Sequence, residues 1–121
     1  MHFLYYCRTP LQSMIVRQLM VRYPAPCTII YHATSSSPKH RFYFDKIDCP
    51  EKVFIKSTPS NWSHTLSEVM LWRSIPKVIR CQKYSDLFIS SIGSIPFGML
   101  IKRNPGARLH TFDDGTFNLN S

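Results

Sequence analysis

The hydrophobic positions of this chain fall into short runs that are separated by polar segments containing proline, serine or asparagine. Five of these runs are rich in aromatic and β-branched residues, a composition typical of buried β-strands. The predicted strands span residues 3–7, 28–31, 52–56, 86–90 and 108–112. Between them the spacing of apolar residues changes to that of a helix.

The first predicted helix has a clear start and end. Thr9 offers a hydroxyl group as N-cap, and Pro10 is favoured at the first helical position. Pro24 ends the helix because proline cannot continue the hydrogen-bonding pattern. The apolar stripe that we expect to face the core consists of Leu11, Met14, Ile15 and Leu19.

Three further helices are predicted between the later strands. A short one is expected over residues 40–47, and a long one begins at Asn61 or Ser63 and is interrupted by Pro76. The last spans residues 94–102 and stops before Asn104. Strands and helices thus alternate, which predicts an α/β, Rossmann-like fold: a parallel sheet with helices on both faces. The 121 residues are enough for a single domain over residues 1–121.

The charge of the chain favours an acidic partner. Fifteen basic residues against seven acidic ones give a net charge of +8, which suits nucleic acid, anionic lipid, or a phosphorylated or carboxylated sugar. The chain has no nucleic-acid-binding motif, so we expect no nucleic acid partner.

Four basic residues would share one helix face if the helix continued through position 76, and this face could contact anionic lipid or simply be solvated: Arg73, Lys77, Arg80 and Lys83.

Other features narrow the class of protein. The four cysteines form no C-x-x-C motif and the five histidines show no metal-ligand spacing, so we expect free thiols and no metal. The opening residues have neither a basic segment nor a long apolar run, so we expect no signal peptide, and no apolar run reaches membrane-spanning length. These features predict a cytoplasmic protein.

Candidate chemistry lies where the predicted strands end, because ligands of such sheets bind at the carboxyl ends of the strands. Residues 7–12, 90–94 and 113–115 form three such loops, and neither of the first two carries a glycine-rich dinucleotide or phosphate fingerprint. Thr9 and Gln12 lie in the first turn of a helix, where free N–H groups can bind an anion. In the alternative interpretation, which residue types alone favour, Thr9 only caps the helix and Gln12 is solvated.

The loop at residues 113–115 contains two adjacent carboxylates. Successive side chains of an extended chain point to opposite faces, so one of Asp113 and Asp114 can face a cleft and act as a general base. Gly115 would supply a tight turn. The pattern alone favours an ordinary Asp-Asp-Gly turn over catalysis.

Two of these loops together resemble a known family. The segment Cys7-Arg8-Thr9-Pro10-Leu11-Gln12, followed about one hundred residues later by Thr111-Phe112-Asp113-Asp114-Gly115-Thr116-Phe117-Asn118-Leu119, resembles glycosyltransferase family 52. This bacterial family contains lipooligosaccharide sialyltransferases. The stretch at residues 16–24, the pair Tyr43-Phe44 and the segment 76–78 are similar to the amino-terminal half of that family, so the resemblance covers nearly the whole chain.

The resemblance implies a GT-B enzyme with two Rossmann-like domains that inverts configuration without a metal. Its donor would be CMP-sialic acid and its acceptor a terminal galactose of lipooligosaccharide or lipopolysaccharide. Asp113 would be the catalytic base and Asp114 a supporting residue, while Thr9, Gln12 and Gly115 would bind substrate.

The sequence also departs from the family. The His-Pro motif that serves the donor phosphate is absent, so we expect an acceptor-side, amino-terminal half that is truncated and inactive alone. The alternative is a non-catalytic glycan-binding or assembly module derived from such an enzyme. A homodimer and peripheral contact with the anionic inner membrane are further expectations.

Overall fold

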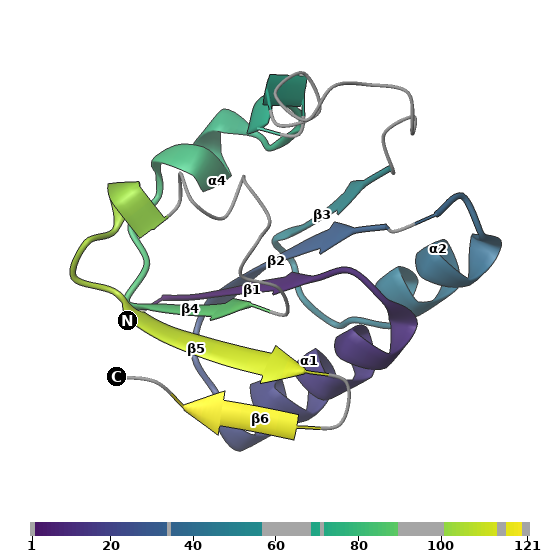
Figure 1. Ribbon diagram of the computed structural model, residues 1–121, viewed down its shortest axis with the longest axis horizontal. Helices are drawn as coiled ribbons and strands as arrows, with labels where there is room; N and C mark the ends of the chain where they lie inside the picture. The colour runs from purple at the N-terminus through teal and green to yellow at the C-terminus, as the bar shows by residue number, and fades with distance from the viewer. Residues whose placement is uncertain are drawn as a thin grey trace.

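The chain forms a six-stranded sheet with helices packed against it (Figure 1). The computed structural model describes residues 2–33, 35–56, 69–70, 72–89, 101–113 and 116–119. For residues 111–113 and 116–119 it describes the backbone only. Its labelled elements are β1 (Phe3–Cys7), α1 (Pro10–Arg22), β2 (Cys27–His32), α2 (Pro38–Asp45), β3 (Lys52–Ile55), α4 (Lys77–Cys81), β4 (Asp86–Ile89), β5 (Arg108–Asp113) and β6 (Thr116–Leu119).

The strand order is β3-β2-β1-β4-β5-β6. The first five strands are parallel to one another, as the alternation of strands and helices predicts. Strand β6 pairs antiparallel with β5 and was not expected from the sequence. The structure therefore confirms the α/β, Rossmann-like fold and adds one antiparallel edge strand.

Alternate residues of the central strand β1 face two separate hydrophobic cores. Phe3, Tyr5 and Cys7 pack with side chains of α1 and α2, whereas Leu4 and Tyr6 pack with side chains of α4 and the segment before it. Figure 1 shows α1 and α2 on one side of the sheet and α4 on the other. Helices thus cover both faces, as expected for strands buried on both sides.

Helix α1 presents a different face to the core than the apolar pattern predicts. Leu11 and Met14 are 47% and 43% exposed. The buried residues of the helix are Gln12, Ser13, Val16 and Leu19. The predicted stripe is wrong at its start, because the side chains of the two polar residues bond to the backbone around the helix start and are buried with it.

Pro76 interrupts its helix, as predicted. The helix therefore does not continue from Arg73 to Lys83, and no continuous helix face carries all four basic residues, Arg73, Lys77, Arg80 and Lys83. The Arg80 guanidinium lies over the Trp72 ring, 5.7 Å from its centroid, and Lys83 Nζ donates to the Arg103 carbonyl at 2.7 Å. Contact with an anionic membrane stays a prediction. Within the described ranges, no helix is long and apolar enough to span a membrane.

The two last predicted helices lie partly outside the described residues. Residues 101–103 are helical and the helix ends before Asn104, as predicted. The Asn104 side chain then accepts a hydrogen bond from the Tyr84 backbone N–H at 2.9 Å, which joins this turn to the start of β4. The predicted start of the long helix at Asn61 or Ser63 lies outside the described part of the chain.

The corrected face of α1 can be tested by a pair of substitutions. Val16 is fully buried and Met14 is 43% exposed, so Val16→Ala should lower the free energy of unfolding by about 2 kcal/mol. Met14→Ala should change it by less than about 0.5 kcal/mol. Urea unfolding followed by circular dichroism measures both, and a larger loss for Met14→Ala would contradict the orientation of the helix.

Candidate functional site

The strand order reverses beside β1. From β1 the chain moves to β2 and β3 on one side, and then returns to β4 on the other side of β1. Ligands of open α/β sheets bind outside the carboxyl ends of the strands at such a reversal. Arg8 and Thr9 directly follow β1 at this point. The predicted loop at residues 90–94 after β4 lies outside the described residues.

The loop after β1 is held by a reciprocal cap. The Thr9 side chain accepts a hydrogen bond from the Gln12 backbone N–H at 3.2 Å, which confirms Thr9 as the N-cap of α1. The Gln12 side chain reaches back and accepts from the Arg8 backbone N–H at 2.8 Å. This is close to a capping box, in which N-cap and third helical residue satisfy each other's backbone groups.

The expectation of a solvated Gln12 is wrong. Gln12 is only 9% exposed, because its side-chain oxygen is needed inside the loop to accept from the Arg8 backbone. Thr9 and Gln12 therefore fix the path of the backbone at the carboxyl end of β1. Any contact of these two residues with a substrate stays a prediction.

A buried Tyr–His pair lies next to this loop. The Tyr6 hydroxyl and His32 Nδ1 are 2.7 Å apart, and His32, the last residue of β2, is 5% exposed. Burial and the neighbouring Arg8 charge lower the pKa of His32 to about 4. His32 is therefore neutral at pH 7. If Nδ1 accepts the Tyr6 hydroxyl proton, the ring proton is on Nε2.

Arg8 supplies a fixed positive charge at this edge. Its Nε atom is buried and has no hydrogen-bond partner among the described residues. A buried guanidinium N–H without an acceptor is costly, and a carboxylate or phosphate is the acceptor that satisfies it best. The arrangement of Arg8 beside a neutral His32 therefore suits an anionic ligand.

The register of the sheet aligns three candidate residues. Tyr6 pairs with Ile30 of β2 and with Ile89 of β4, and Ile89 pairs with Thr111 of β5. If this register is extended by two residues, the backbones of His32, Arg8 and Asp113 fall near one level at the carboxyl edge. Neighbouring strands are about 4.8 Å apart, so the backbones of Arg8 and Asp113 are separated by roughly 10 Å.

The structure describes only part of the predicted acidic loop. Asp113 is the last residue of β5, and it pairs with Thr116 of β6. Two residues, Asp114 and Gly115, connect the strands and lie outside the described residues, as does the side chain of Asp113. Asp-Gly between paired strands is a common hairpin sequence. The catalytic roles of Asp113 and Asp114 and the binding role of Gly115 stay predictions.

The remaining buried histidines have structural partners. His40 Nδ1 lies 2.8 Å from the Tyr31 hydroxyl, and burial lowers the pKa of His40. His110 Nε2 lies 2.8 Å from Asp86 Oδ1. Among the described residues there is no group of three or more histidine, cysteine, aspartate or glutamate side chains that could hold a metal ion.

Sequence reasoning missed Arg8, Tyr6 and His32 as members of one site. Arg8 belongs to a loop that the sequence did single out, but nothing in its residue type shows that its Nε lacks a partner. Tyr6 and His32 are 26 residues apart. Their contact depends on the parallel register of β1 and β2, which the sequence alone does not give.

The neutral state of His32 predicts a pH dependence of stability. Its folded-state pKa of about 4 lies below the ordinary value of 6.5, so protons bind more tightly to the unfolded chain. The stabilisation is fully present above pH 6.5 and is lost as the pH falls toward 4, by about 3 kcal/mol in total.

Substitution of His32 should remove this contribution. In His32→Gln, a variant without a titratable group at this position, the free energy of unfolding should fall less steeply between pH 6.5 and pH 4 than in the unchanged chain. Urea titrations at a series of pH values measure the difference. Parallel curves for the two proteins would show that His32 is not buried in its neutral form.

Comparison with known proteins gives two distant relatives. No protein-family model matches the chain. The chain is 26% identical over 124 residues to the N-acetyllactosaminide α-2,3-sialyltransferase of Neisseria meningitidis serogroup A / serotype 4A, covering 96% of this chain and 32% of the relative. It is 24% identical over 114 residues to the CMP-N-acetylneuraminate:β-galactoside α-2,3-sialyltransferase of Pasteurella multocida, covering 93% of this chain and 36% of the relative. The chain thus spans about a third of the length of these relatives and is distantly related to bacterial α-2,3-sialyltransferases.

Proposed function

We propose that this chain forms the acceptor-side half of a sialyltransferase of the family 52 type, with a GT-B arrangement in the whole enzyme. The observation that carries the proposal is the alignment of Arg8, His32 and Asp113 at the carboxyl edge of the sheet, at the reversal of strand order. The names of the two relatives supply the reaction: transfer of sialic acid to a galactoside.

The proposed reaction needs a base. An acceptor hydroxyl oxygen attacks the anomeric carbon of CMP-sialic acid, the bond from that carbon to the phosphate oxygen breaks, and CMP leaves. The hydroxyl proton goes to the Asp113 carboxylate, with Asp114 as a supporting group and Gly115 allowing the turn. The transition state has oxocarbenium character, as in glycoside hydrolysis. A carboxylate at the end of β5 is suited to this role because it can meet the acceptor at the crevice.

The proposed role of Arg8 is to contribute one contact from this acceptor-side half to the negative charge of the donor, most of whose binding groups would belong to the other half of the whole enzyme. CMP-sialic acid carries a phosphate and a carboxylate, and the buried Nε of Arg8 lacks an acceptor among the described residues. The neutral His32 does not compete as a second cation, and it can offer an Nε2 proton. Thr9 and Gln12 act by fixing the loop that carries Arg8.

The binding role of Arg8 can be tested on the 121-residue chain. Arg8→Gln should weaken binding of CMP-N-acetylneuraminate at least tenfold, because a hydrogen bond to a charged group contributes about 1.5–3 kcal/mol. Arg17→Gln removes an exposed arginine of α1 and is the matched control. Isothermal titration calorimetry gives the dissociation constants.

Separate titrations with CMP and with N-acetylneuraminate show whether Arg8 binds the phosphate or the carboxylate. Equal affinities for Arg8→Gln and Arg17→Gln would contradict the role of Arg8. Failure of all three ligands to bind the unchanged chain would contradict the proposed contact between Arg8 and the donor.

The base is tested in a full-length relative that carries this segment. There Asp113→Asn should lower the rate of sialic acid transfer by roughly 100-fold to 10,000-fold, the usual contribution of a general base. Asp45→Asn changes an exposed carboxylate on α2 and should leave the rate unchanged. Near-normal transfer by Asp113→Asn would show that another group takes the proton.

One observation favours the alternative of an assembly module. The outer side of α1 carries the exposed apolar side chains of Leu11, Met14 and Val21, and Met14 and Val21 line a surface hollow together with Arg17 and Gln18. Exposed apolar surface of this kind is typical of protein contacts. A second copy of the chain, or a further domain of the whole enzyme, would cover it.

A further inference from the structure

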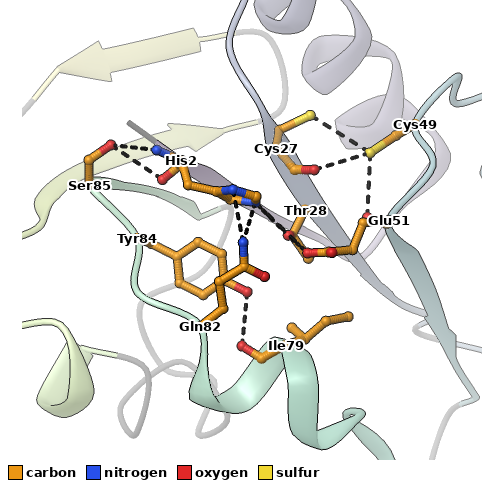
Figure 2. A network of polar contacts seen from close by, with 9 residues as sticks. All are labelled: His2, Cys27, Thr28, Cys49, Glu51, Ile79, Gln82, Tyr84 and Ser85. Carbon is orange, nitrogen blue, oxygen red and sulfur yellow. Dashed lines mark hydrogen bonds and ion pairs between the residues drawn. The ribbon is translucent and has the colours of Figure 1, made fainter.

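A second group of reactive side chains lies at the opposite edge of the sheet from the proposed site. Figure 2 shows side chains from the amino ends of β1 and β2 and from the segment before β3 in one network of polar contacts. Within this network the sulfur atoms of Cys27 and Cys49 are 3.7 Å apart. Both cysteines are free thiols.

Several contacts hold the two thiols in place. The Ile29 backbone N–H donates to the Glu51 carbonyl at 3.0 Å, and the Thr28 hydroxyl bonds to the Glu51 carboxylate. Lys52 lies at the start of β3, and its Nζ donates to the carbonyls of Phe44 and Ile47, at 3.2 and 2.9 Å. The segment before β3 is therefore fixed against the start of β2, and the two sulfur atoms stay in contact.

The surroundings make the two thiols unequal. The hydrogen bond from Cys27 lowers the pKa of Cys49 to about 7, although burial opposes this shift. The same hydrogen bond, together with burial, raises the pKa of Cys27. The Cys49 thiol also lies 3.4 Å from each of the carbonyls of Cys27 and Glu51, and the net shift of its pKa is downward. Cys49 is thus the thiol that ionises first.

We propose that Cys27 and Cys49 form a redox-active pair, which hydrogen peroxide converts into an intramolecular disulfide between the start of β2 and the segment before β3. The proposal rests on the contact between the two sulfur atoms and on the fixed backbone around them. It is independent of the proposed sugar transfer.

The oxidation proceeds in two balanced steps. The Cys49 thiolate attacks one oxygen of hydrogen peroxide, the O–O bond breaks, and Cys49 becomes a sulfenic acid with release of hydroxide. The Cys27 sulfur then attacks the Cys49 sulfur, the S–O bond breaks, and water leaves. The proton of Cys27 goes to this departing oxygen, and the proton that Cys49 lost on ionising neutralises the hydroxide of the first step, so two thiols and one peroxide give one disulfide and two waters. Cys27 is half-buried and Cys49 is 6% exposed, so a small oxidant reaches the pair more readily than a large one.

The other two cysteines differ from this pair. Cys7 is fully buried in the core and burial raises its pKa. Cys81 is exposed at the end of α4. Because Cys81 can form disulfides between molecules, Cys81→Ser is the background in which the pair is tested.

In the Cys81→Ser protein, peroxide should produce a monomer that is lighter by two hydrogen atoms. A tryptic digest without reductant should contain one linked peptide pair joining Cys27 to Cys49, which dithiothreitol separates. The disulfide closes a loop between residues 22 positions apart, so the unfolding midpoint should rise by on the order of 10 °C. Absence of the linked peptides would overturn the proposal.

Two further variants in the same background test the separate roles. In Cys27→Ser, the sulfenic acid of Cys49 has no partner and should be trapped by dimedone. In Cys49→Ser, Cys27 should react with dimedone at least several-fold more slowly. Circular dichroism confirms that both variants are folded. Equal trapping in the two variants would overturn the assignment of Cys49 as the attacking thiol.

Discussion

The position of β1 between two parallel neighbours is the constraint on which the rest of the structure depends. All five residues of this strand are buried, and it pairs with β2 on one side and β4 on the other. A buried backbone has to be fully hydrogen-bonded, so β1 fixes the register of both neighbours. That register places Arg8 level with His32 at the carboxyl edge, and it places His2 beside Thr28 at the amino edge.

Local chemistry in the sequence was enough to predict most of the elements. Thr9 and Pro10 define the start of α1 because a cap and a fixed φ act within one turn. The same reasoning could have predicted the burial of Gln12, since Thr9-Pro10-Leu11-Gln12 has the spacing of a capping box. The hairpin to β6 also had a local signal, the Asp114-Gly115 dipeptide before an alternating segment. Both signals are short, and a pattern search for long helices and buried strands passes over them.

The candidate site was less predictable because its members come together only through the sheet. The Tyr6–His32 contact joins residues 26 positions apart, and it requires β1 and β2 to be parallel and in one particular register. The relative position of Arg8 and Asp113 also depends on register, because β4 lies between β1 and β5 and pairs with both. A sequence shows which residues can carry chemistry. The register decides which of them meet, and a shift by one residue would move every side chain of a strand to the other face.

The two edges of the sheet are linked through β2, which begins at Cys27 and ends at His32. These residues are separated by five steps of an extended chain, roughly 17 Å. Between them, β2 is hydrogen-bonded to β1 on one side and to β3 on the other, so it behaves as a rigid connection. A disulfide at its start would tie β2 to the segment before β3 without touching the register with β1. The Tyr6–His32 pair would therefore keep its geometry, and oxidation would change the stability of the β2–α2–β3 unit rather than the arrangement of the proposed site.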